Sequence, residues 1–499
     1  MATTEHDLRL DILNTLLTTP HRKLEAVWPV HQEMVGQDPR FYVHLAAWYH
    51  DHGEVRDHKE MFVVSLVLSN FPGHRDVGLA LLRNLPPYEV GRVLDFINGR
   101  KKTRKVRATA KTPAQTVEEL GLFRNPPRAL RTEIARYLRE READVEWFDS
   151  SVLVARKTMK RLYALLHVAP GERAQKILFE EEPPADSRLF ALRVLAQAGS
   201  PAEQARAIVE HQIPYRVAAA VVRQMTPTVL LALIERMSPQ ELINNLGALR
   251  RRGVLDNPDL KALVERKLEA AKTDTRVSAY KAQVAADAAG ATAEMAKALD
   301  AVTETRVKAR GRIKRPTALL LDKSGSMSVA LEVGRQLGAM ISAVCAAELY
   351  AYAFDSIAYP VEPKGASLAD WEKALLGVHA GGSTSCGVVL EWMARQGQRV
   401  EQIVLVTDEG ENTTPLFKDA YDTYARTVNV RPAVTIVKIG QATNTIEQAC
   451  RAKGVPLNVV EFRGDYYALP NVIPFLTAPS QTELLMEILN YPLPERKAG

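Results

Sequence analysis

A carboxylate and two hydroxyls stand at alternate positions where an apolar run ends, in the segment Asp322-Lys-Ser324-Gly-Ser326. Side chains with this spacing on a turn that leaves a strand can converge on one point. Oxygen ligands without a thiolate or an imidazole suit Mg²⁺, which keeps several of its waters and accepts few protein carboxylates. The segment therefore predicts a binding site for a hard divalent cation.

Two later segments offer further oxygen ligands. Thr384 provides a hydroxyl on the glycine-rich loop 381–387, and Asp408 provides a second carboxylate at the end of the apolar run 403–407. The alternative is that Asp322 and the two serines cap the helix that follows, because Asp and Ser are common helix N-caps. Thr384 and Asp408 each follow a strand-like run in the expected order, and this favours the metal site.

Short apolar runs separated by helical patterns indicate the fold that positions these ligands. We expect buried strands at residues 317–321, 348–354, 402–407, 433–439 and 457–461. Continuous apolar strands that alternate with helices are typical of a parallel sheet in an α/β doubly wound, Rossmann-like fold. Ligands of such sheets bind beyond the carboxyl ends of the strands, and Asp322 and Asp408 both lie there.

The part of the chain before this sheet has a helical pattern. From about residue 7 to residue 300, apolar residues recur at spacings of three and four, as in 41–52, 61–69, 130–141, 160–168 and 216–224. Paired helices of this length favour an all-α helical-repeat domain over residues 1–305, with the alanine-rich segment 270–305 as a helical link. We expect the α/β domain to span residues 306–490, followed by a tail over 491–499.

Basic residues gather in three runs, although the net charge is only +6. One spans 100–111 and contains no acid, a second is Arg156, Lys157, Lys160 and Arg161, and a third spans 306–315. A single charge run is usually a solvated face or a linker, but three runs favour contact with nucleic-acid phosphates. By charge we assign RNA contact to Lys101, Lys102, Arg104, Lys105, Arg107, Lys111, Lys157 and Arg161.

The metal pattern resembles the metal-ion-dependent adhesion site of von Willebrand factor A domains. Its Asp-x-Ser-x-Ser, threonine and aspartate match Asp322, Ser324, Ser326, Thr384 and Asp408. The helical half resembles the TROVE module of the Ro autoantigen family in segment 237–255, which contains Asn244-Asn-Leu-Gly247, and also in 130–137 and 162–170. A TROVE module followed by an A domain is the Ro architecture.

The Ro resemblance implies a HEAT-like ring of helices, made by one chain and closed by the A domain. Ro proteins hold single-stranded 3′ ends of misfolded noncoding RNAs in this ring and bind Y RNAs on its outer surface. Basic positions of the family carry over to Arg128, Arg131 and Lys160. His167 matches the same motif, although such a histidine is alternatively a packed or capping residue. The A-domain resemblance implies a non-catalytic Mg²⁺ that leaves one coordination position for a partner's carboxylate.

Several function classes are excluded. No histidine stands in a motif that pairs it with a nucleophile, and no glycine-rich loop carries the lysine of a P-loop, so we expect no enzyme. His50, Asp51, His52 and His58 indicate either a polar turn or a second metal site. No run approaches the roughly 20 apolar residues of a membrane span, and a secretory signal is absent. We expect a monomeric cytoplasmic protein without a disulfide framework.

Two functions remain. The first is an RNA-binding, Ro-like protein of RNA quality control, whose partners are noncoding RNA, including a Y-like RNA, and an exoribonuclease or other protein at the Mg²⁺ site. The alternative is a metal-dependent adaptor that binds proteins, such as a ring ATPase, without an RNA function. The basic runs and the Asn-Leu-Gly signature favour the first function.

Overall fold

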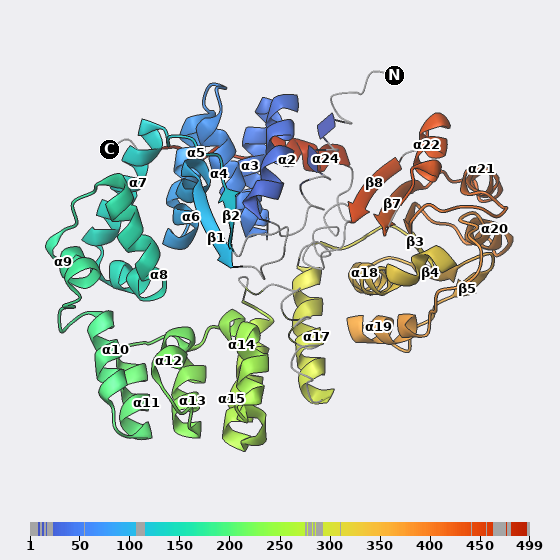
Figure 1. Cartoon of the computed structure of the whole chain (residues 1–499). Helices are drawn as coiled ribbons and strands as arrows, with labels where there is room; N and C mark the ends of the chain where they lie inside the picture. The colour runs from blue at the N-terminus through green and yellow to red at the C-terminus, as the bar shows by residue number, and fades with distance from the viewer. Residues whose placement is uncertain are drawn as a thin grey trace. The chain divides into compact units, whose positions relative to one another are not determined.

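The computed structural model describes residues 8, 9, 12, 13, 16, 23–53, 55–105, 115–274, 277, 282, 285, 293–309, 311–440, 442–455, 457–462, 476 and 481–496. The chain divides into two compact units (Figure 1). The helical unit comprises His21–Ser238, Leu249–Val264 and Met486–Gly499, and the sheet unit comprises Met1–Pro20, Pro239–Ala248 and Glu265–Leu485. Among the described residues, no helix is long and apolar enough to cross a membrane.

The helical unit is a row of short helices that follow one another in chain order along a curve (Figure 1). Neighbouring helices pack together, among them α4 with α5, α7 with α8 and α11 with α13, because each helix has one apolar stripe to bury. This confirms the predicted all-α helical repeat. The helices are α2 (Leu24–Gln37), α3 (Pro39–His52), α4 (Arg56–Leu68), α5 (His74–Arg83), α6 (Pro87–Asn98), α7 (Arg128–Ala143), α8 (Val145–Leu166), α9 (Glu172–Gln175), α10 (Arg188–Gln197), α11 (Pro201–Glu210), α12 (Tyr215–Val221) and α13 (Pro227–Arg236).

Several of these helices begin at an Asp, Ser or Thr followed by proline. Asp38 accepts a hydrogen bond from the amide of Phe41 at 2.9 Å at the start of α3. Ser200 and Glu203 form a reciprocal capping box at the start of α11, and Thr226 caps α13. The side-chain oxygen satisfies an amide that has no partner within the helix, and proline at the first position loses no hydrogen bond.

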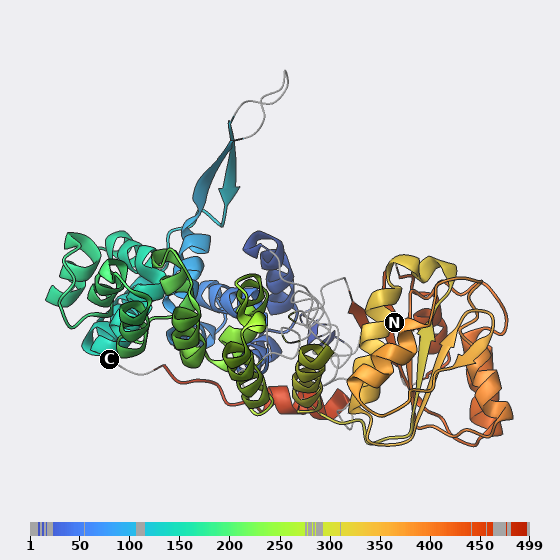
Figure 2. The ribbon, with the colours of Figure 1, turned by 90° about the horizontal axis from the view of Figure 1, so that it is seen from below.

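A β-hairpin interrupts the helices where the first basic run was predicted to contact RNA. Strand β1 (Arg100–Lys105) pairs antiparallel with β2 (Gln115–Leu120), and the hairpin projects from the helices (Figure 2). Its base is fixed by Gly99 and Gly121, both at positive φ, and a side chain at Gly121 would come within 2.4 Å of the Phe96 carbonyl oxygen. The helical pattern did not predict this hairpin, because the charges of β1 hide the alternation typical of a strand.

The sheet unit contains a six-stranded sheet in the order β5-β4-β3-β6-β7-β8, parallel except for β5 at one edge. This confirms the predicted doubly wound parallel sheet, to which the structure adds the short strand β5. The strands are β3 (Thr317–Asp322), β4 (Leu349–Phe354), β5 (Ala358–Pro360), β6 (Gln402–Thr407), β7 (Ala433–Ile439) and β8 (Leu457–Phe462).

Helices cover both faces of this sheet. On one face, α20 (Val388–Arg395), α21 (Phe417–Thr427) and α22 (Thr445–Ala452) share a buried core with Leu320 and Leu405 of the sheet. On the other face, α18 (Leu331–Val344) packs so closely that a side chain at Gly334 would lie 2.8 Å from Leu321. Helix α19 (Leu368–Leu376) packs on α18. Alternate residues of β3 therefore enter two cores, which explains its continuous apolar run.

Of four further helices, three are divided between the two units, and the fourth lies wholly in the sheet unit. They are α14 (Pro239–Arg251), which carries the Asn244-Asn-Leu-Gly247 signature, α15 (Pro258–Ala271), α17 (Ala293–Lys308) and α24 (Gln481–Leu489). Helix α17 packs on α18 and α19 within the sheet unit. Of the expected helical link over 270–305, the structure describes the end of α15, residues 272–274, 277, 282 and 285, and the part of α17 from 293 to 305, and the other residues lie outside the description.

The last described residues, 486–496, form a strap along the helical unit. The Trp48 indole donates to Glu487 at 2.9 Å, the Tyr491 hydroxyl donates to Asp51 at 2.6 Å, and Arg496 donates to the buried Glu133 at 2.8 Å. The strap thus contacts α3 and α7, which come from the opposite end of the chain.

Candidate metal centre and nucleic-acid interface

The first three predicted metal ligands lie at the carboxyl end of β3. Asp322 is the last residue of the strand and is fully buried, and Ser324 and Ser326 occupy the short 3₁₀ turn that follows, Gly325–Val329 and its N-cap. The amide of Ser324 donates to the Asp322 carboxylate at 2.8 Å, and the hydroxyl oxygens of the two serines are 3.1 Å apart. The turn therefore brings the carboxylate and both hydroxyls to one place.

Thr384 lies on a loop that is bonded to two neighbouring loops. The Gly325 amide donates to the Gly382 carbonyl at 3.1 Å, which joins the loop to the turn after β3. The Thr384 amide donates to the side chain of Asn412 at 2.9 Å, and the Cys386 amide donates to Glu411 at 3.1 Å, which joins it to the segment after β6. Thr384 is thereby held in place from both sides.

Asp408 lies beside the serine turn, directly after β6. Its carboxylate accepts a hydrogen bond from the Gly410 amide at 2.9 Å. A side-chain carbon built on Gly410 would lie 2.9 Å from the Asp408 carboxylate and 3.7 Å from the Ser326 hydroxyl, so the two ligands are close neighbours. The structure thus places Asp322, Ser324, Ser326 and Asp408 near one another, and Thr384 on a loop that is bonded both to the serine turn and to the segment after β6.

The electrostatics of this cluster favour a cation. Burial raises the pKa of Asp322, and the negative charge of Asp408 raises it further, whereas hydrogen bonds from Thr407 and Ser324 lower it. The adjacent Lys323 does not neutralise the pair, because its ammonium pairs with Asp355 and lies 4.8 Å from the Tyr359 ring centroid. A divalent cation between the two carboxylates would relieve their repulsion.

The ligand set fits a hard cation. It consists of two carboxylates and three hydroxyls, and no cluster of three or more His, Cys, Asp or Glu occurs among the described residues. The nearby Cys386 is fully buried, and burial raises the pKa of its thiol well above the usual range. This oxygen set suits Mg²⁺ better than Zn²⁺ or copper.

The histidines near residue 50 do not converge on a metal. His58 is buried and bonded to His31 at 2.8 Å, and His31 is bonded to the Tyr42 hydroxyl at 2.7 Å. His52 stacks on Trp48 and bonds its carbonyl oxygen at 2.9 Å. Among the described residues, these side chains form no group of three or more His, Cys, Asp or Glu that could hold a metal ion.

The second basic run lies on α8. Lys157, Lys160 and Arg161 are all exposed, and the exposed apolar side chains of Val154 and Leu165 lie on the same helix. Arg161 is partly engaged by Asp95 of α6 at 2.6 Å, and Lys160 lies 5.5 Å from the Phe179 ring centroid. Exposed cations clustered along one helix are the electrostatic feature expected of a nucleic-acid contact.

The remaining predicted RNA-contacting residues lie on three other elements of the helical unit. Arg128 and Arg131 are exposed at the start of α7, and the exposed His167 ends α8 in the left-handed conformation, which supports its alternative interpretation as a capping residue. Lys101 on β1 pairs with Glu119 of β2 at 3.1 Å. Lys102, Arg104 and Lys105 lie opposite Glu118, Thr116 and Gln115 in the hairpin register. Arg107 and Lys111 lie outside the described residues.

Sequence reasoning missed the residues that support the metal ligands. Glu411 and Asn412 hold the Thr384 loop, and Glu409 bonds to residues after β7. The only signal in the sequence was the cluster of acidic and amide side chains directly after β6. Likewise, Glu118 and Glu119 of β2 lie opposite Lys102 and Lys101 of the first basic run. This pairing could be predicted only together with the hairpin.

Among the solved structures that match, a Ro protein matches nearly the whole chain. The Ro (Rsr) protein of Deinococcus radiodurans superposes with a TM-score of 0.64 and 17% sequence identity, over 94% of this chain and 99% of that one. A von Willebrand factor type A protein from Catenulispora acidiphila matches 34% of this chain and 43% of that one at 22% identity and a TM-score of 0.27. Proximal thread matrix protein 1 of the mussel byssus matches 37% of this chain and 51% of that one at 16% identity and a TM-score of 0.27.

No protein-family model matches the sequence, and no curated protein matches it. The resemblance to the Ro family that the sequence indicated is thus confirmed in the fold, because the helical unit and the sheet unit of this chain both fall within the part that matches the Deinococcus Ro protein. The chain has the fold of the Deinococcus Ro protein along nearly its whole length.

Proposed function

We propose that the protein binds noncoding RNA through its helical unit and a divalent cation through its sheet unit. The observation that carries the proposal is the agreement between the two halves. The fold of a Ro protein extends over 94% of the chain. Of the five positions that the sequence predicts to hold a metal, four lie at or just after the carboxyl ends of β3 and β6, and the fifth, Thr384, lies on a loop bonded to the turn after β3.

RNA binding would begin with phosphates. The exposed cations of α8 and of the first turn of α7 attract a phosphate backbone without reading bases, so selection would depend on the presence of a free single-stranded end. The RNAs that we propose as ligands are misfolded or structured noncoding RNAs with a single-stranded 3′ end, and a Y-like RNA. In this role the protein would act as a monomer in RNA quality control.

The metal would recruit a protein partner. Asp322, Ser324, Ser326, Thr384 and Asp408 would hold Mg²⁺ directly or through water, and a remaining coordination position would accept a carboxylate of the partner. An exoribonuclease is the kind of partner that suits RNA quality control. The donor set contains no group that supplies or removes a proton at a substrate, so we propose a binding role for the metal.

A structured RNA with a single-stranded 3′ tail tests the RNA proposal. Its affinity would be measured by fluorescence anisotropy across a salt series and compared with that of the same RNA without the tail. We expect binding that depends on the tail and that weakens steeply with salt. Weak binding that is indifferent to the tail would contradict the proposal.

The second candidate function is a metal-dependent protein adaptor without RNA. It is favoured by the pairing of Lys101 with Glu119 and of Arg161 with Asp95, which reduces the charge available to RNA. The ratio of absorbance at 260 nm and 280 nm of the purified protein separates the two candidates. Copurifying nucleic acid supports the RNA function, and a ratio typical of protein alone, together with absent binding of the tailed RNA, supports the adaptor.

A further inference from the structure

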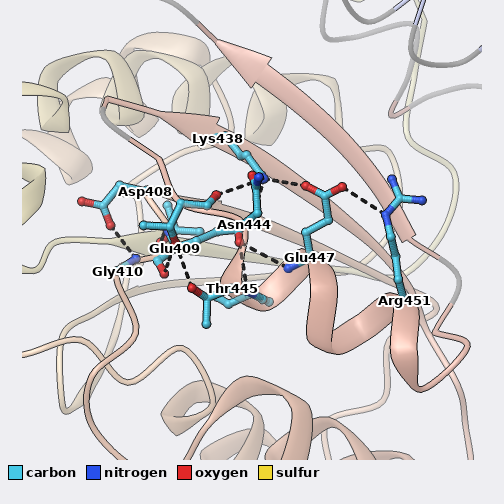
Figure 3. Close-up of polar contacts among 11 residues, drawn as sticks. Asp408, Glu409, Gly410, Lys438, Asn444, Thr445, Glu447 and Arg451 are labelled. Carbon is cyan, nitrogen blue, oxygen red and sulfur yellow. Dashed lines mark hydrogen bonds and ion pairs between the residues drawn. The ribbon is translucent and has the colours of Figure 1, made fainter.

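A buried lysine lies at the end of β7, close to the metal ligands. Lys438 is only 4% exposed, and its ammonium contacts four oxygens (Figure 3). These are Glu409 at 3.0 Å, Glu447 at 2.6 Å, the Asn444 side chain at 2.7 Å and the Thr443 carbonyl at 3.1 Å. Such a complete set of partners is needed to keep a charged ammonium out of water.

Glu409, which directly follows the proposed ligand Asp408, joins the metal loop to this lysine. It is 1% exposed and has a φ of 58°, the left-handed backbone that glycine normally occupies. One carboxylate oxygen pairs with Lys438, and the other accepts hydrogen bonds from the amides of Ile446 at 2.9 Å and Glu447 at 3.2 Å. Glu409 therefore caps α22 with a side chain from a different loop (Figure 3).

Thr443 and Thr407 hold the backbone of Asp408 and Glu409 by hydrogen bonds. The Asp408 carbonyl accepts a hydrogen bond from the Thr443 amide at 2.9 Å, and the Glu409 carbonyl accepts one from the Thr443 hydroxyl at 2.9 Å. The Glu409 amide donates to Thr407 at 3.0 Å. These contacts fix the backbone from which the Asp408 side chain projects, and the Gly410 amide holds its carboxylate at 2.9 Å.

Packing alone does not explain this arrangement. Apolar residues of similar volume usually stabilise a core as well as a buried ion pair does, or better, and a non-glycine residue in a left-handed conformation is strained by about 1 kcal/mol or more. Strain and buried charge beside a binding site are typical of residues that hold that site in one geometry.

We infer that Lys438 and Glu409 are positioning residues for Asp408 and set the affinity of the sheet unit for its divalent cation without touching the cation. The inference rests on the proposed metal site. Lys438 acts through Glu409, Glu409 acts through the backbone of Asp408, and the loop after β7 becomes part of the metal centre.

The test is the affinity of the full chain for Mg²⁺, measured by isothermal titration calorimetry on the wild type and on Lys438→Met. Loss of a residue that orients a metal ligand typically weakens metal binding about 10-fold to 100-fold, and we expect a loss in that range. The matched control is Arg451→Met. Arg451 belongs to the same network, pairs with Glu447 at 3.0 Å and does not contact Glu409, so its affinity should stay within about twofold of wild type.

Further measurements separate positioning from a purely structural role. The melting temperature in chelator reports the stability of the metal-free chain. A variant with a lower melting temperature but wild-type affinity for Mg²⁺ would show a purely structural role and overturn the inference. If Lys438→Met does not fold, Glu409→Gln takes its place, because it keeps the shape and removes the charge. Combining both changes should weaken Mg²⁺ no more than the worse single change, whereas additive losses would contradict the chain of contacts. A wild type that does not bind Mg²⁺ refutes the metal site itself, and with it this inference.

Discussion

Replacing Asp95 with Asn should strengthen RNA binding, although no basic residue is added. In the structure Asp95 holds the guanidinium of Arg161 at 2.6 Å, while 44% of the Arg161 side chain remains exposed. Burial raises the pKa of Asp95 against the opposing effect of Arg161, so the site already disfavours the charged carboxylate and should tolerate the neutral amide. Asp95→Asn would release Arg161 to a phosphate.

The size of the effect follows from counterion release. One additional phosphate contact on a single strand raises the slope of log affinity against log salt by about 0.7. Between 50 mM and 200 mM salt, a fourfold range, this slope corresponds to an additional loss of affinity of about 2.6-fold. The assay is anisotropy titration of a labelled, tailed RNA at four or more salt concentrations.

Asp186→Asn is the matched control, because it changes the net charge by the same amount in the same unit. Asp186 pairs with Arg173 at 2.9 Å, but Arg173 also pairs with Asp149 at 2.7 Å and stays engaged when Asp186 is neutralised. The control should leave the salt slope unchanged. An equal rise in both variants would show a general effect of net charge, and no rise in Asp95→Asn would refute the assignment of Arg161 to RNA.

The remaining predictions concern the metal, the hairpin and the strap. Asp322→Ala should abolish the stabilisation of the folded chain by Mg²⁺, which amounts to about 2.7 kcal/mol at a Mg²⁺ concentration 100 times the Kd. The same change should alter RNA affinity less than twofold, because we propose separate sites for metal and RNA. RNA binding that is lost in chelator would contradict separate sites. Folding raises the pKa of Asp322 and therefore favours its protonated form. The metal-free chain should lose stability as the pH rises from about 4 through that raised pKa. Thermal melts of Asp322→Asn in chelator should not show this loss. Arg496→Ala should lower the free energy of unfolding of the helical unit, measured in urea, by about 1 to 3 kcal/mol, because the buried Glu133 loses a partner. The control Lys23→Ala removes an exposed ion pair with Glu118 and should lower it by less than about 1 kcal/mol. Combined neutralisation of four hairpin cations should lower the salt slope by about 2, the value for three contacts, rather than by about 2.8 for four, because one of them, Lys101, is paired with Glu119. An unchanged slope would make the run a solvated strand. The four cations are Lys101, Lys102, Arg104 and Lys105.

The parallel strands were predictable almost to the residue. Strands β6 (Gln402–Thr407) and β7 (Ala433–Ile439) have the predicted limits, and β3 extends one residue further, to Asp322. A strand buried on both faces must be apolar throughout, so the signal is strong and local. The positions that we propose as metal ligands were equally visible, because they closely follow such a run or lie on a glycine-rich loop.

Contacts between distant loops were not predictable. Asn412 reaches Thr384 across 28 positions, and nothing in either segment indicates the other. Lys438 gave one unused signal, since a lysine near the end of an apolar strand must find partners for its charge. Strand β5 (Ala358–Pro360) is too short for any periodicity to appear, and the hairpin strand β1 was read as a charge run because its cations outweigh its strand propensity.

The strap over residues 486–496 has a consequence for synthesis of the chain. His44 and Tyr491, which are in hydrogen-bond contact, are 447 positions apart. A ribosome that adds about 5 to 20 residues per second needs roughly 20 to 90 seconds to make the polypeptide between them. During that interval the faces of α3 and α7 that the strap covers are bare, so the nascent helical unit stays incomplete until residues 486–496 have been made. A product that terminates before residue 486 never receives this cover, and we expect it to expose the buried Glu133 to solvent.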